Sequence, residues 1–140
     1  METSPMEPNR TLVVVTQAEL RSLRRLATFL SLSTTIAEQA RRSPGNLGVE
    51  LRSRSPRRWC TMTAWTDAEA AAAFVASDPH RSAMRETARL IRRNTFARFT
   101  TDDALGAHLW PRAFDALDAS RALEASRDLD AARQPSPDRR

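Results

Sequence analysis

The chain has 140 residues, of which 41% are hydrophobic, and its formal net charge is +5. This length fits one domain, and no apolar run approaches the ~20 residues that a membrane span requires. All 22 basic residues are arginine, which together with abundant alanine indicates a coding bias, and no basic motif is interleaved with aromatic residues. We therefore predict a protein that spans no membrane and binds no nucleic acid.

A single cysteine, Cys60, allows no internal disulfide, and the sequence has no CxxC pair for a metal. Cys60 lies in an apolar run, where a buried structural thiol is the more common role. Residues 1–10 are polar and contain Glu2 and Glu7, unlike a secretory signal peptide. A flexible leader and a reducing, cytoplasmic location are the simplest interpretation.

The first predicted elements are a strand and a helix. Residues 11–16 are β-branched and apolar, which is typical of a buried strand. A helix is predicted from about Ala18 to Arg41, with a wide apolar stripe. Basic residues and the breaker Ser43-Pro44-Gly45-Asn46 end it.

A β-hairpin is predicted next. Residues 47–54 alternate between apolar and charged side chains, as in a half-buried strand. A turn at residues 55–58 leads to a second strand at residues 59–65. One face of that strand carries Trp59, Thr61, Thr63 and Trp65, and the other carries Cys60, Met62 and Ala64.

Two shorter helices and a strand follow. Thr66 and Glu69 have the spacing of a capping box, with Thr66 as the N-cap of a helix that runs to about Ala76. A further helix is predicted to begin with Asp78 as N-cap and Pro79 in its first turn, and to reach about Arg92. Its apolar stripe consists of Met84, Ala88 and Ile91, and a last strand covers residues 95–101.

This order, β-α-β-β-α-β, predicts an α+β domain of the ferredoxin-like type. Helices on one face of the sheet leave the other face open, so we expect a second copy to cover it in a homodimer. A C-terminal extension, with a helix at residues 108–118, completes a domain at residues 11–118. The polar residues 119–140 are interpreted as a disordered tail.

Several short stretches within residues 11–101 resemble the antibiotic-biosynthesis-monooxygenase-like superfamily: residues 43–48, residues 59–65, Phe74 and residues 77–81. Residues 96–99 are similar to the spheroidene-monooxygenase branch. The resemblance implies a dimeric α+β barrel built from two ferredoxin-like protomers. It also implies either a cofactor-independent oxygenase of aromatic polyketides or a protein that binds or degrades haem. Trp65 and His80 match two residues of the haem-degrading branch, but no asparagine lies in the first strand.

His80 is the candidate catalytic residue. In the first turn of its helix, the positive end of the helix dipole disfavours the imidazolium form. A neutral imidazole can accept a proton or ligate haem iron. The alternative is a partly exposed histidine that packs against the preceding turn.

Trp59, Trp65, Phe74 and Met84 are the candidate ligand-binding residues. The two tryptophans share one strand face, where they either line an apolar cavity or pack in a core or dimer interface. The spacing of Arg81, Arg85, Arg89 and Arg92 is that of a solvated helix face, and His108 is interpreted as a surface residue.

The functional prediction is a monooxygenase that acts on an apolar or aromatic small molecule. The cofactor is expected to be either none or haem, and no other metal site is expected, because the sequence has only two histidines and no acidic cluster beside them. The alternatives are a haem-binding protein and a non-catalytic module for small-ligand binding or dimerisation.

Overall fold

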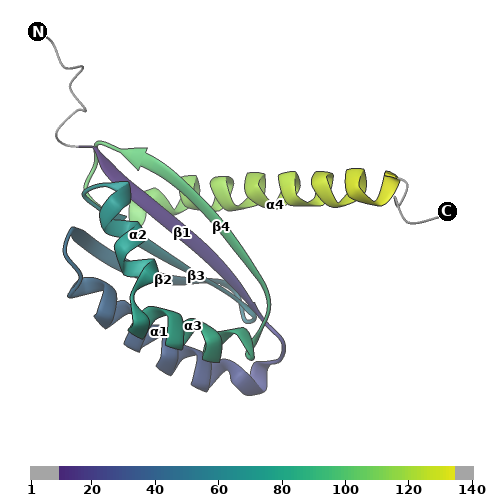
Figure 1. The fold of residues 1–140 in the computed structure, drawn as a ribbon, viewed down its shortest axis with the longest axis horizontal. Coiled ribbons are helices and arrows are strands. Elements are labelled where there is room, and N and C mark those ends of the chain that lie inside the picture. The colour runs from purple at the N-terminus through teal and green to yellow at the C-terminus, as the bar shows by residue number, and fades with distance from the viewer. Residues whose placement is uncertain (1–9, 135–140) are drawn as a thin grey trace, which may run out of the picture.

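The computed structural model describes residues 10–134 as one antiparallel four-stranded sheet with helices on both faces (Figure 1). The predicted α+β fold with ferredoxin-like order is confirmed, with the second helical segment divided in two. The expected leader, apart from Arg10, and residues 135–140 lie outside the described residues. Among the described helices, none is long and apolar enough to cross a membrane.

The strands have the order β2-β3-β1-β4 across the sheet, and β1 pairs antiparallel with both β3 and β4. Short 3-10 turns precede α1 and α4. The elements are β1 (Thr11–Leu20), α1 (Leu26–Arg41), β2 (Asn46–Ser55), β3 (Arg58–Trp65), α2 (Ala68–Ala76), α3 (Asp78–Ala88), β4 (Ile91–Thr101) and α4 (Trp110–Arg133).

The first helix begins later than the sequence predicts. Residues expected in its first turn continue β1 as far as Leu20, and Ala18 and Leu20 are buried against Phe29 of α1. Their alternation with Glu19 fits the two-residue period of a strand, and packing on the sheet decides between the two structures.

The helix caps also differ from the prediction. Asp67, not Thr66, is the N-cap of α2, and its Oδ1 accepts a hydrogen bond of 2.8 Å from the amide of Ala70. Ser77, not Asp78, precedes α3, so Asp78 and Pro79 occupy its first two positions. His80 is therefore the third residue of α3.

The sheet face expected to be open is covered by α4. Trp110, Ala113 and Leu117 of this helix pack on Val13, Val15, Cys60 and Met62 of the sheet. Arg54 of β2 donates hydrogen bonds of 2.7 and 3.1 Å to the carboxylate of Asp118. This packing removes most of the apolar surface from which a second copy was inferred.

A disordered tail is wrong for residues 119–133, which continue α4. This half of the helix extends away from the sheet (Figure 1), and Leu123 and Leu129 on it are 53% and 60% exposed. Adding residues to an existing helix costs far less than starting one. The packed first half provides that start, and the alanine, leucine and arginine of residues 119–133 favour continuation.

Candidate functional site

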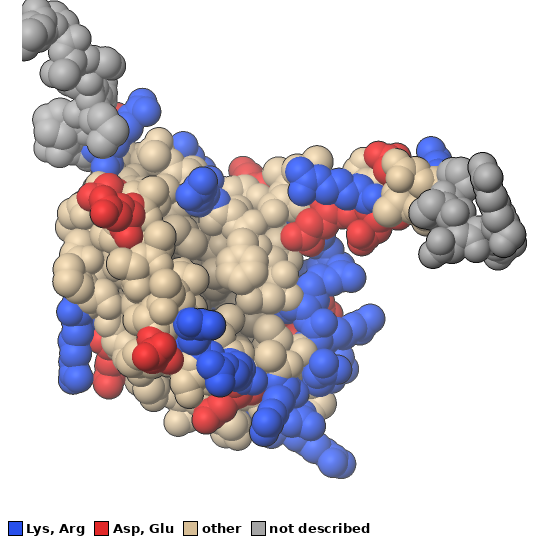
Figure 2. Space-filling view, in the orientation of Figure 1, with Lys and Arg blue, Asp and Glu red and all other residues tan. Residues whose placement is uncertain are grey.

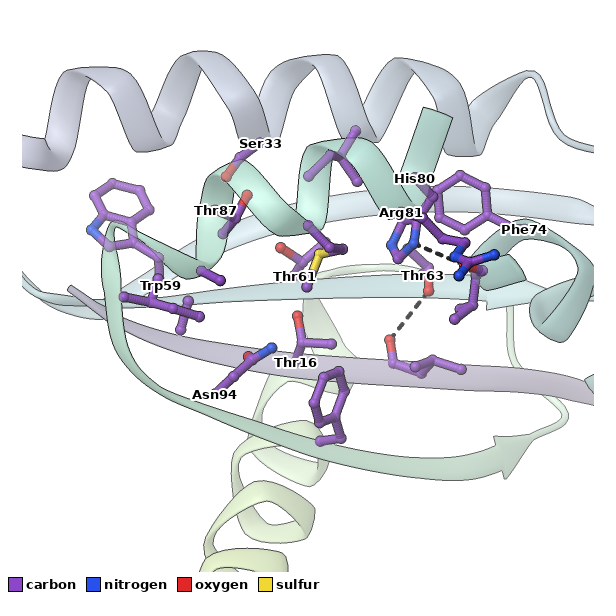
Figure 3. Close-up of a pocket in the computed structure, with 18 of the residues that line it drawn as sticks. Thr16, Ser33, Trp59, Thr61, Thr63, Phe74, His80, Arg81, Thr87 and Asn94 are labelled. Atoms are coloured by element: carbon purple, nitrogen blue, oxygen red, sulfur yellow. Dashed lines mark hydrogen bonds between the residues drawn. The ribbon is translucent and has the colours of Figure 1, made fainter. Parts of the chain in front are cut away.

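An elongated cavity of about 580 Å³ lies between the sheet and helices α1, α2 and α3 (Figure 3). It follows β3 from Trp59 to Trp65, a distance of ~20 Å at the rise of a strand. Side chains from six elements line it: Val14, Thr16, Ala18, Phe29, Ser33, Ile36, Trp59, Thr61, Thr63, Trp65, Ala71, Phe74, Val75, His80, Arg81, Met84, Arg85, Thr87, Ala88, Ile91, Asn94 and Phe96.

The floor of the cavity is made of threonines. Thr16 of β1 pairs with Thr61 of β3, and Thr63 follows two residues further along β3 on the same face. These side chains are small for the space between a sheet and the helices that cover it. Their size leaves the volume that larger apolar residues would fill.

Three of the predicted site residues, Trp65, Phe74 and His80, form an aromatic cluster at one end of the cavity, and Figure 3 shows Phe74 and His80 there. The ring centroids of Trp65 and Phe74 are 5.4 Å apart, and those of Phe74 and His80 are 4.6 Å apart with an edge-to-face angle of 60°. The indole nitrogen of Trp65 donates a hydrogen bond of 2.9 Å to the hydroxyl of Thr63. This cluster fixes the positions of the rings, as edge-to-face packing favours.

The imidazole of His80 is held in one tautomer when it is neutral. Its Nδ1 lies 3.2 Å from the carbonyl oxygen of Val75, which can only accept a hydrogen bond, so Nδ1 carries the proton and Nε2 has a free lone pair. Burial lowers the pKa of His80 below its usual 6.5, although the hydrogen bond to Val75 opposes this shift. His80 is therefore neutral at pH 7.

Trp59 lies at the opposite end of the cavity, and Met84 of α3 lines it as well. The indole of Trp59 donates to the carbonyl oxygen of Pro56 at 3.1 Å. All five residues that the sequence singled out thus line one cavity. Their roles in ligand binding and catalysis stay predictions.

Sequence reasoning missed other lining residues. Thr16, Ser33 and Asn94 add polar atoms, and Phe96, which is 53% exposed, lies at the β4 side. Arg81 and Arg85 were assigned to a solvated face, and both are exposed, yet both also line the cavity. The signal that could have found them is their place next to His80 and Met84 on α3.

Cys60 lies on the other face of the sheet. It is fully buried, its Sγ is 3.6 Å from Oε1 of Gln17, and burial raises the pKa of the thiol to about 11. Across residues 10–134, no group of three or more histidine, cysteine or acidic side chains is placed to hold a metal ion. His108 pairs with Asp103 at the surface, at 3.7 Å.

A ferredoxin-like sheet with a cavity beneath its helices defines a small α+β protein with an internal cavity. Residues 11–86, more than half of the chain, match the family model of the antibiotic biosynthesis monooxygenases. The chain therefore belongs to this family, and the resemblance inferred from the sequence is confirmed. No curated protein sequence matches the chain.

Solved structures of distant sequence share the fold. The chain is similar to SnoaB of Streptomyces nogalater, a cofactor-independent oxygenase, with 20% identity over 69% of this chain and 97% of that one and a TM-score of 0.57. It is similar to a conserved protein of Methanosarcina mazei, with 12% identity over 66% and 93% of the two chains and a TM-score of 0.62. A protein of Shewanella oneidensis gives 16% identity, coverage of 66% and 92%, and a TM-score of 0.60.

The two tryptophans that line the cavity are predicted to differ in their contribution to stability. Trp65 is 2% exposed and packs on Phe74, so Trp65→Ala is expected to lower the free energy of unfolding by about 3–5 kcal/mol. Trp59 is only half-buried, so Trp59→Ala should cost clearly less. Denaturant melts of both variants beside the parent measure this, and equal losses would contradict the assignment of Trp65 to the core.

Proposed function

We propose that this protein is an oxygenase that uses dioxygen to oxidise an apolar or aromatic small molecule inside the cavity. One observation carries the proposal: an apolar cavity of about 580 Å³ extends to a histidine that is neutral and has a free Nε2. This volume is within the range of sites for drug-sized ligands. Membership of the monooxygenase family supports the same reaction class.

His80 would act as the general base. Its Nε2 removes a proton from an acidic methylene group of the substrate, and the carbanion combines with dioxygen to form a hydroperoxide. Loss of water from the hydroperoxide leaves a carbonyl group, so one oxygen atom enters the product and the other leaves as water. The surrounding apolar side chains exclude solvent, which strengthens the interaction between base and substrate.

A cavity of this size disfavours the alternative of a pure interaction module, which is expected to have a filled interior. The haem-binding alternative keeps one specific observation in its favour. His80 would hold the iron of a bound haem through Nε2, and its hydrogen bond from Nδ1 to the carbonyl oxygen of Val75 would orient the imidazole for that role. Bound haem would supply iron chemistry with dioxygen.

Catalysis by His80 predicts a specific pH dependence. Because burial lowers the pKa of His80, the base stays unprotonated somewhat below pH 6.5, and kcat/KM should fall only at lower pH. The measurement is dioxygen consumption with anthrone, a tricyclic ketone with an acidic methylene group, corrected for the uncatalysed reaction. His80→Gln should lose about 100-fold or more in rate.

His108→Gln is the matched control, since His108 lies at the surface outside the cavity, and it should retain the parent rate and pH profile. Unchanged turnover in His80→Gln would show that His80 is not the base.

Binding of hemin distinguishes the haem-binding alternative from the cofactor-independent oxygenase. If haem is the cofactor, hemin titrated into the purified protein should give a sharp Soret band that weakens in His80→Ala and not in His108→Ala. If hemin does not bind, the haem alternative is wrong and the cofactor-independent oxygenase remains.

We also propose that the protein is a homodimer, joined through the second half of α4. Every described residue from position 122 onward is exposed in the protomer, so this half of the helix is accessible to a second copy. The exposed Leu123 and Leu129 supply apolar surface that a second copy would bury.

Sedimentation tests the dimer. The parent should sediment as a dimer at micromolar concentration, and the double variant Leu123→Glu/Leu129→Glu should sediment as a monomer. Arg133→Glu changes a charge on the same helix without removing apolar surface, and this control should remain dimeric. A parent that sediments as a monomer would refute the proposal.

A further inference from the structure

The charged side chains that line the cavity all carry the same sign. Among the residues that line it, Arg81 and Arg85 are cationic and none is acidic. The third titratable group, His80, is neutral because burial lowers its pKa. An apolar space bordered only by positive charge favours a ligand that carries negative charge.

Arg81 and Arg85 lie one helical turn apart on α3, where like charges repel each other. Within residues 10–134, neither guanidinium takes part in an ion pair or a side-chain hydrogen bond. Both groups are exposed at the cavity, and Figure 3 places Arg81 beside His80 and Phe74. The fold itself thus gives these two charges no counterion.

Two arginines on the other side of the sheet do have partners. Arg54 pairs with Asp118 and lies over the ring of Phe114 at 4.5 Å, and Arg112 lies over the ring of Phe99 at 4.4 Å. Figure 2 shows basic side chains, with acidic ones among them, over the region of α3, beside a surface that is largely free of charged residues. Other arginines, such as Arg89 and Arg93, also lack a side-chain partner among the described residues, and what distinguishes Arg81 and Arg85 from them is that both line the cavity.

We propose that the ligand of this cavity is an apolar carboxylate, whose carboxylate group binds Arg81 and Arg85 while its hydrocarbon body extends over the threonine floor toward Trp59. This inference names the substrate class of the oxygenase and rests on that proposed function for the identity of the site. A guanidinium group matches a carboxylate in geometry, since two parallel N–H groups donate to its two oxygens. The apolar lining requires that the rest of the ligand be mostly hydrocarbon.

In the middle of the cavity, a few polar side chains can interact with polar groups on the hydrocarbon body of the ligand. Thr16 and Thr61 face each other across β1 and β3, and Asn94 of β4 lies beside them (Figure 3). Their side chains can donate to a carbonyl or hydroxyl group on the ligand. Specificity would then come from the position of such a group relative to the carboxylate.

Two probes of the same shape test the proposal: 9-anthracenecarboxylate and 9-anthracenemethanol. Their binding is followed by quenching of tryptophan fluorescence, since Trp59 and Trp65 line the cavity, and by calorimetry. The carboxylate should bind the parent about tenfold more tightly than the alcohol, the size of effect expected for a charge-assisted hydrogen bond. In Arg81→Gln/Arg85→Gln this preference should disappear, with the affinity for the alcohol unchanged.

The matched control is Arg89→Gln/Arg92→Gln, which removes the same charge from two neighbouring arginines that do not line the cavity. It should keep the preference for the carboxylate. Equal affinity of the parent for both probes would overturn the carboxylate proposal but would leave the proposed oxygenase cavity in place. Failure of both probes to bind would count against the proposed function of the cavity itself. An equal loss of preference in the control would also overturn the proposal, because it would assign the effect to net charge.

Discussion

The alternation of side chains along β1 and β3 is the constraint on which the rest of the structure depends. Val13, Val15, Cys60 and Met62 point to one face and pack against α4. Val14, Thr16, Thr61 and Thr63 point to the other face, where smaller polar side chains leave space beneath the helices. Because the period of a strand is two residues, a shift of register by one would exchange the packed face and the cavity face.

This division explains why α4 matters to the cavity although it does not line it. If helices covered only one face of the sheet, the second apolar face would need another partner to cover it. Here α4 covers that face within the protomer, and Arg54 holds it there through Asp118 while also donating to Gln17 of β1 at 3.1 Å. The packed face thereby stabilises the strands whose other side forms the floor of the cavity.

Features that depend on the residue pattern within one element were predictable from the sequence. Features that depend on contacts between elements were not. The two faces of β3 follow from alternation alone, so Trp59 and Trp65 were correctly placed on the same face of the strand. Residues 18–20 fit either a strand or a helix until contact with α1 favours the strand. The border of the cavity along α3 depends on the rotation of that helix against β4 and on the size of the residues beneath it, so Arg81 and Arg85 appeared from sequence as ordinary surface residues.

In the proposed oxygenase, the two faces of the sheet would also keep the thiol of Cys60 apart from the reaction with dioxygen. A thiolate near reacting dioxygen is open to oxidation, and the neutral thiol is far less reactive. Cys60 lies on the face opposite the cavity, and burial raises its pKa to about 11, so it remains a thiol at neutral pH. His80, by contrast, is buried enough to stay neutral yet borders the cavity. Burial thus acts on both groups in the same physical way, by disfavouring the charged form. The two groups lie on opposite faces of the sheet, and of the two only the imidazole of His80 lines the cavity.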